Sequence, residues 1–208
     1  MGAHADRPGR AESTAAAAAF NTVLSARGIR SAYQPVVDCR DGTVVGFEAL
    51  ARGPQRTVWH SPDALVDYAT RVGRLPELDW ICRAAACRGA LDAAFPPHLR
   101  LFINVEPASA RTRCPVDLQG IIATAPQRLR LVAEVTERAI ADDPPALLKV
   151  VEQLRDAGYE IALDDVGAVP ESLRMSEDIR PDVVKFDKNI VQHSESATAR
   201  DVIQWSRR

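Results

Sequence analysis

Five short apolar runs in this chain each carry a charged or metal-binding residue at or near the C-terminal end. A buried strand gains nothing from such a residue, because burying an unpaired charge costs free energy. We therefore expect these polar groups to converge on one face of a parallel sheet or barrel, where cations hold the carboxylates together. The runs are VVGFEAL with Glu48, LFINVEP with Asn104, LVAEVTE with Glu134, IALDDVG with Asp164 and Asp165, and VVKFDKN with Lys185.

The spacing of the runs indicates βαβ units. Thirty residues separate Asn104 from Glu134, and thirty more separate Glu134 from Asp164. Amphipathic helical patterns such as PALLKVVEQLRDAGY lie between the strands, as in parallel α/β folds. In an open sheet only the strands near the switch point could bring such residues together, whereas all strand ends meet on one face of a (β/α)8 barrel. The sequence therefore predicts an α/β fold and favours the barrel.

The N-terminal part departs from this regular pattern. Residues 1–11 are rich in small, charged, Pro and Gly residues, which predicts a disordered tail before one domain over residues 12–208. A helix capped by Ser13 or Thr14 should follow and end at Gly28. Two strands, SAYQPVVD and TVVGFEALAR, should then form an antiparallel hairpin through the turn at Asp41-Gly42. Further helices are expected from Ser61-Pro62, over Glu77–Phe95, over ESLRMSEDI and from Lys188 onward.

Composition excludes several classes of protein. A formal net charge of −2 and a pI near 6.1 do not indicate the positive charge that binding to duplex nucleic acid requires. The sequence has no apolar stretch of about 18 residues, so we expect no membrane segment. The N-terminus lacks the apolar region of a signal peptide. The four cysteines form no CxxC pair, so a structural zinc site is not expected. We therefore expect a cytoplasmic protein.

The strand-end residues suit a divalent cation. Glu48, Asn104, Glu134 and Asp164 offer hard oxygen ligands, which fit Mg²⁺ or Mn²⁺ better than zinc. Asp165 could serve a second ion, and two ions would activate water and stabilise the leaving oxygen of a phosphodiester. Two basic residues complete the hypothesis: Lys185 would orient the attacking water or neutralise charge on phosphate, and Arg52 would bind phosphate oxygens with its planar fork.

Each of these residues also has a structural interpretation. A single glutamate near a strand end is more often a surface charge, Asn104 could cap a turn, and the paired aspartates could cap a loop. Lys185 could be a solvated edge residue, and Arg52 could pair with any nearby acid. These explanations would have to hold independently at five strand ends, so the metal-site hypothesis is favoured.

Six ordered motifs resemble those of one known family. From about residue 20 to the C-terminus, the chain resembles the EAL-domain cyclic-di-GMP phosphodiesterases through YQPVVD, FEALAR, FINVEP, AEVTE, ALDDVG and VVKFD. The resemblance implies a modified TIM barrel that binds Mg²⁺ or Mn²⁺, linearises cyclic-di-GMP to pGpG and can form a homodimer. It implies metal ligands at Glu48, Asn104, Glu134 and Asp164, a second-metal carboxylate at Asp165, a catalytic lysine at Lys185, and substrate contacts at Gln34 and Arg52.

The chain departs from the family pattern in two places. After the paired aspartates the family usually has Phe-Gly-Thr-Gly, whereas this chain has Val166-Gly167-Ala168-Val169-Pro170. The sequence also ends soon after the sixth expected strand, so strands 7 and 8 and a metal-binding glutamate of the seventh are not within it. We therefore expect an incomplete barrel and weak or absent hydrolysis by this chain. The alternatives are a cyclic-di-GMP receptor, a protein-interaction module, or, less favoured, a metal-dependent barrel enzyme of other specificity.

Overall fold

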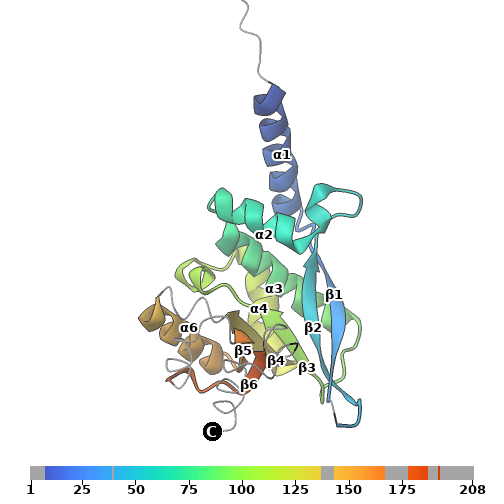
Figure 1. Ribbon diagram of the computed structural model, residues 1–208, viewed down its shortest axis with the longest axis vertical. Coiled ribbons are helices and arrows are strands. Elements are labelled where there is room, and N and C mark those ends of the chain that lie inside the picture. Colours follow the sequence, from blue (N-terminus) through green and yellow to red (C-terminus); the bar gives the residue numbers. More distant parts are fainter. Residues whose placement is uncertain (1–7, 39, 137–142, 167–177, 187–191, 193–208) are drawn as a thin grey trace, which may run out of the picture.

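A curled six-stranded sheet forms the centre of the protein (Figure 1). The computed structural model describes residues 8–38, 40–136, 143–166, 178–186 and 192. The first two strands pair antiparallel and the other neighbours pair parallel, which confirms the expected hairpin and parallel sheet. This half-barrel is consistent with an incomplete TIM-type barrel. In spatial order the strands are β1 (Arg30–Val37), β2 (Val44–Arg52), β3 (Arg100–Asn104), β4 (Arg130–Thr136), β5 (Glu160–Val166) and β6 (Val183–Phe186).

Helices cover one face of this sheet, and the first helix extends outward from the molecule (Figure 1), while Phe20, Val23 and Leu24 near its C-terminal end are buried in a core cluster. Short 3-10 turns connect several of the elements. The helices are α1 (Pro8–Ser25), α2 (Pro62–Arg71), α3 (Leu75–Asp92), α4 (Val116–Thr124) and α6 (Pro144–Asp156), and the turns are η1 (Val58–His60), η2 (Pro107–Arg111) and η3 (Ala125–Gln127). Among the described residues, no helix combines the length and the hydropathy needed to cross a membrane.

The start of α1 differs from the sequence prediction. The helix begins at Pro8, ahead of the expected cap at Ser13 or Thr14, so residues 8–11 are helical rather than part of a tail. Proline is well tolerated in a first helical turn, because its missing N–H would have no partner there. The expected tail over residues 1–7, the loop after Val166, most of ESLRMSEDI and nearly all of the segment from Lys188 lie outside the described residues.

Strict alternation along the strands separates two faces of the sheet. On β4, Leu131, Ala133 and Val135 belong to the main core with α3 and α6, whereas Val132 and Glu134 lie on the opposite, inner face. This follows from the two-residue period of a strand. The other strands continue the apolar inner layer with Val36, Phe102, Ala162 and Val183.

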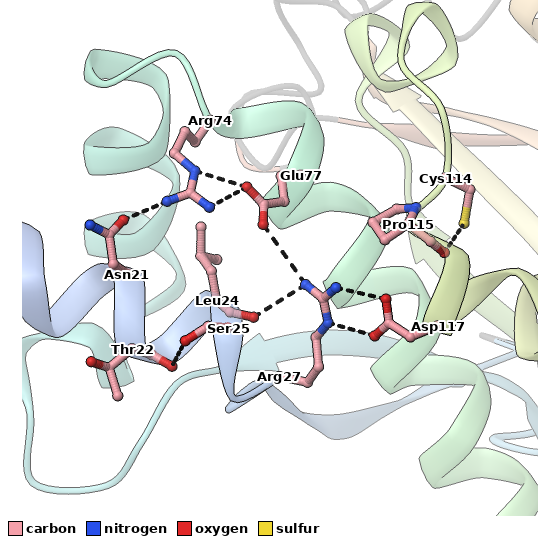
Figure 2. A network of polar contacts seen from close by, with 10 residues as sticks. All are labelled: Asn21, Thr22, Leu24, Ser25, Arg27, Arg74, Glu77, Cys114, Pro115 and Asp117. Carbon is pink, nitrogen blue, oxygen red and sulfur yellow. Dashed lines mark hydrogen bonds and ion pairs between the residues drawn. The ribbon is translucent and has the colours of Figure 1, made fainter.

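A polar network joins the C-terminal end of α1 to the body of the protein (Figure 2). Arg27 donates two hydrogen bonds, of 2.9 and 2.8 Å, to the carboxylate of Asp117 at the start of α4, and lies 3.8 Å from Glu77 of α3. Arg74 bridges Glu77 and Asn21 of α1. Because Glu77 on α3 contacts both Arg27 and Arg74, the network fixes the position of the C-terminal end of α1 relative to α3.

Gly46 is required where β2 passes close to β3. A Cβ at this position would lie 2.5 Å from the carbonyl oxygen of Arg100 and 2.9 Å from the ring of Phe102. We expect Gly46→Ala to lower the free energy of unfolding by about 2 to 3 kcal/mol, because the contact is with backbone that cannot shift without disturbing strand pairing. Chemical denaturation would measure this. The matched control is Gly120→Ala in α4, where the added Cβ meets open space and should stabilise by about 0.5 to 1 kcal/mol; equal effects would contradict the explanation.

Candidate active site

Four of the strand-end residues meet on the inner face of the sheet. The Nζ of Lys185 on β6 lies 2.6 Å from Oε1 of Glu134, 2.9 Å from Oε2 of Glu48 and 3.4 Å from Oδ1 of Asp164. All four continue the inner-facing alternation of their strands. The convergence predicted from the sequence therefore exists for β2, β4, β5 and β6, and it places one ammonium group among three carboxylates.

Glu134 is the most deeply buried member of this group. Its side chain has no exposed surface, and its Oε2 is buried with no hydrogen-bond partner among the described residues. Burial raises the pKa of Glu134 to about 7, and the nearby Lys185 opposes that rise only in part. A bound cation is one kind of partner that would satisfy such a buried oxygen.

Lys185 supplies the positive charge of the group. Burial alone would lower the pKa of Lys185, but the interactions with Glu134, Glu48 and Asp164 raise it above its ordinary value. The lysine is therefore charged over the whole physiological range. It acts as the local counter-ion that lets three carboxylates share one face of the sheet.

Asn104 and Gln34 border this cluster. Asn104 pairs in register with Glu134 across β3 and β4, and Gln34 pairs with Glu48 across the β1–β2 hairpin. Both are exposed on the same inner face. The side-chain amide of Gln34 therefore lies next to Glu48, and that of Asn104 lies next to Glu134.

An irregularity in β5 keeps Asp165 out of the core that Leu163 and Val166 join. The register between β5 and β6 shifts between Leu163 and Val166, and Asp165 has a φ of 56°, in the left-handed region. The backbone N–H of Asp165 donates a 3.0 Å hydrogen bond to Oδ1 of Asp164, which stabilises this conformation. Asp164 consequently faces Lys185, while Asp165 is exposed at the strand end.

Arg52 lies apart from the four-residue cluster. Its Nη1 donates a 2.8 Å hydrogen bond to the carbonyl oxygen of Ala51, and its side chain lines a separate cavity of about 580 Å³ with Arg27, Arg30 and His60. The structure therefore does not bring Arg52 into contact with Glu48, although both lie on β2.

A larger cavity opens beside the cluster. It has a volume of about 660 Å³ and is lined by Leu50, Asn104, Glu134 and Thr136, together with residues of α2 and α3. This volume falls in the range of small-molecule sites, and its wall combines apolar surface with a few convergent polar groups. Asn104 and Glu134 thus face a space able to hold part of a ligand, whereas Glu48, Asp164 and Lys185 are not among the residues that line it.

Sequence reasoning missed one residue that supports this site. Asp79 on α3 is 8% exposed, and its Oδ1 accepts a 3.0 Å hydrogen bond from the backbone N–H of Glu106, two residues after Asn104. Asp79 also lies 3.3 Å from the guanidinium of Arg83. The signal was an acid and a base four residues apart within the apolar helix LDWICRAAAC, where an isolated charge would be costly.

Comparisons with known proteins agree with the fold. A sequence profile described as EAL domain matches residues 17–208. The chain belongs to the EAL domain family. It is 34% identical over 163 residues to the "Probable cyclic di-GMP phosphodiesterase PdeB" of Escherichia coli K12, which covers 76% of this chain and 31% of that protein. The chain spans about a third or less of the length of the curated relatives it matches first.

Solved EAL structures share the fold. Klebsiella pneumoniae BlrP1, in a complex with manganese and cyclic-di-GMP, aligns with a TM-score of 0.69 and 27% identity over 85% of this chain and 45% of that chain. Vibrio cholerae LapD bound to cyclic-di-GMP aligns with a TM-score of 0.73 over 92% of this chain and 47% of that chain. At 16% identity, the LapD match supports the fold alone.

The donor set of this EAL site fits a divalent cation in chemistry. Glu48, Asn104, Glu134 and Asp164 supply carboxylate and amide oxygens, and Glu134 retains a buried oxygen without a hydrogen bond. In the described part of the chain, however, no three His, Cys, Asp or Glu side chains are arranged to hold a metal ion as they stand. The position of Lys185 explains this, because its ammonium group already lies among the carboxylates.

Proposed function

We propose that this EAL domain hydrolyses cyclic-di-GMP to the linear dinucleotide pGpG. The observation that carries the proposal is the convergence of Glu48, Glu134, Asp164 and Lys185 at the strand ends, beside a cavity of about 660 Å³. The family match and the named relatives support the substrate class.

We propose that Mg²⁺ or Mn²⁺ binds to Glu48, Asn104, Glu134 and Asp164, and that Asp165 is a ligand of a second ion. The manganese complex of BlrP1 supports a divalent cation. When bound, such ions activate water for attack on a phosphodiester and stabilise the leaving oxygen.

The chain's own residues would orient the substrate and balance charge. Lys185 stays protonated, so its ammonium group can hold the attacking water or neutralise charge that develops on the phosphate. Gln34 lies beside Glu48 and can donate hydrogen bonds to the dinucleotide. Arg52, from its own cavity, would reach a more distant part of the substrate.

Turnover of cyclic-di-GMP by the 208-residue chain tests this proposal. We expect only slow formation of pGpG with Mn²⁺, in keeping with the weak hydrolysis expected from the sequence, and Glu48→Gln to reduce that rate about 100-fold or more, on the scale of removing one group that stabilises a transition state. Chromatographic separation of pGpG gives the rate. The control is Glu152→Gln, an exposed glutamate on α6, which should keep full activity. Failure to detect pGpG with either metal would contradict hydrolysis.

Binding without hydrolysis is a second candidate. It is favoured by the lysine among the carboxylates and by the lack, in the described ranges, of a preformed carboxylate group for a metal. Calorimetric titration with cyclic-di-GMP in Ca²⁺, combined with the pGpG assay in Mn²⁺, distinguishes the two: binding in Ca²⁺ with no pGpG formed in Mn²⁺ supports a receptor, and no binding excludes it.

A further inference from the structure

The cavity that Arg52 lines has a strongly basic wall. It has a volume of about 580 Å³, in the range of small-molecule sites, and lies where the end of α1, the start of β1 and the end of β2 meet. Arg27, Arg30, Arg52 and His60 line it, and none of the described residues in its wall is acidic. A concave surface that carries basic charges without acidic ones favours an anionic ligand.

The charge of Arg27 is balanced outside the cavity. Its guanidinium donates two hydrogen bonds to the carboxylate of Asp117 and lies 3.8 Å from Glu77, and Figure 2 shows it between these two acids. The positive charges that remain for a ligand are therefore those of Arg30 and Arg52.

Arg30 and Arg52 lie opposite each other in the hairpin. They are direct partners in the register of β1 and β2, so both side chains are on the same face of the sheet. Among the described residues neither side chain forms an ion pair, and the one hydrogen bond that they donate is from Arg52 to the carbonyl oxygen of Ala51. Like charges directly opposite destabilise a pair of strands. An anion bound between the two guanidinium groups would remove this repulsion.

Both arginines can present donors to a ligand. Arg30 is exposed, Arg52 is half-buried, and no unpartnered nitrogen of Arg52 is shut off from solvent. A guanidinium group carries five N–H donors in a planar fork that matches the oxygen atoms of a phosphate group.

The loop after β2 forms a fixed wall of the same cavity. A Cβ at Gly53 would lie 2.0 Å from the carbonyl oxygen of Trp59, so the loop can fold back on itself only with glycine at this position. Trp59 is buried in the core cluster that includes Phe20 of α1. The Nδ1 atom of His60 lies 3.2 Å from the carbonyl oxygen of Gly53, which holds the ring at the cavity wall.

We propose that this cavity binds a phosphate group with two negative charges, either free or at the end of a small molecule. Its two unbalanced arginines match the charge of a phosphate monoester, about −1.5 to −2 near pH 7, better than the single charge of a phosphodiester. The site is distinct from the carboxylate cluster, because four residues of extended strand, or about 13 Å, separate Arg52 from Glu48. Arg30 has no role in the proposed hydrolysis, and binding here requires neither a metal nor cyclic-di-GMP.

Isothermal titration calorimetry in metal-free buffer of low ionic strength tests the proposal. Methyl phosphate and dimethyl phosphate are the matched probes, because they differ by one methyl group and one negative charge. We expect methyl phosphate to bind at one site per chain, with a dissociation constant on the order of 1 mM or below. Dimethyl phosphate should bind about tenfold more weakly. No binding of methyl phosphate would overturn the site, and equal affinities would overturn the preference for two charges.

Inorganic phosphate and guanosine 5′-monophosphate distinguish the two sources of such a group. Equal affinities for the two would show that the phosphate alone is recognised, and tighter binding of the nucleotide would show that the cavity also holds the attached molecule. Both results support the site, whereas binding of neither would overturn it.

Two variants locate the bound phosphate. Arg30→Gln should weaken the binding of methyl phosphate about tenfold or more, as expected for loss of a charge-assisted hydrogen bond. Gln55→Glu, at an exposed position in the cavity wall, should also weaken it because it adds a negative charge. Arg128→Gln and Gln127→Glu, at exposed positions outside the cavity wall, are the matched controls and should bind normally. Unchanged binding by Arg30→Gln, in protein shown to be folded by circular dichroism, would overturn the site.

Cyclic-di-GMP provides the test that the site is distinct. In Ca²⁺, its affinity for Arg30→Gln should equal that for the unaltered chain. An equal loss of affinity for cyclic-di-GMP and for methyl phosphate would show that the cavity belongs to the substrate site, and would overturn the proposal. The titrations with methyl phosphate contain no cyclic-di-GMP, so their failure and the failure of hydrolysis are distinguishable.

Discussion

Lys185→Met is expected to lower the free energy of unfolding by about 2 to 4 kcal/mol at pH 8 in metal-free buffer. The ammonium group lies 2.6, 2.9 and 3.4 Å from three carboxylates, so its removal leaves them to repel one another. The loss should be smaller at pH 5, because Glu134, whose pKa is raised to about 7, then binds a proton. Chemical denaturation at the two pH values measures both effects.

Manganese should partly restore the stability of Lys185→Met. A divalent cation that binds the same carboxylates replaces the missing ammonium charge and stabilises the folded state by mass action. The increase in midpoint temperature with Mn²⁺ should therefore be larger for Lys185→Met than for the unaltered chain. Lys149→Met, which removes an exposed lysine from α6, is the control. Two results would contradict the counter-ion role of Lys185. One is a loss of unfolding free energy in Lys185→Met no larger than in Lys149→Met, and the other is a loss that is equal at pH 5 and pH 8.

Glu134→Gln is expected to stabilise the metal-free protein at pH 8 while removing the proposed activity. The ionised form of Glu134 is disfavoured by burial, and a pKa of about 7 against an ordinary 4.5 corresponds to about 3 kcal/mol at most. The amide keeps an oxygen for Lys185 but carries no charge. We expect a gain of about 1 to 3 kcal/mol, together with loss of pGpG formation by about 100-fold or more.

The pH dependence gives the sign of this effect. Because the folded-state pKa of Glu134 lies above its unfolded value, the folded protein binds more protons between about pH 4.5 and pH 7. The contribution of Glu134 to stability therefore falls as pH rises through that window and is constant above it. The stability difference between Glu134→Gln and the unaltered chain should grow over the same window. A variant less stable than the unaltered chain at pH 8 would show that the ion pair with Lys185 outweighs burial.

Sequence reasoning predicted the fold and most of the cluster because both depend on local patterns. The two-residue period of the strands and the order of the βα units determine which residues face inward, and they place Glu48, Glu134, Asp164 and Lys185 on one face. The hairpin followed from its turn residues in the same way.

The remaining features depend on contacts between distant segments. The pairing of Asp79 with Glu106 requires knowing that α3 packs against the end of β3, and no spacing in the sequence specifies this. Four residues of extended strand separate Arg52 from Glu48, and the cavity that Arg52 lines is completed by Arg27, Arg30 and His60 from other segments. The start of α1 at Pro8 differs from the predicted tail because alanine, glutamate and arginine, which are small or charged, all favour helices.

The alternation along the strands also determines which changes in chain length this domain can tolerate. Deleting one residue within β4 would exchange its two faces, turning Glu134 toward the helices and an apolar residue toward the ligand cavity. Deleting one residue from a connecting segment changes neither face. Among relatives of this chain, insertions and deletions should therefore fall between the strands, and those few within them should come as pairs or as bulges like the one at Asp165.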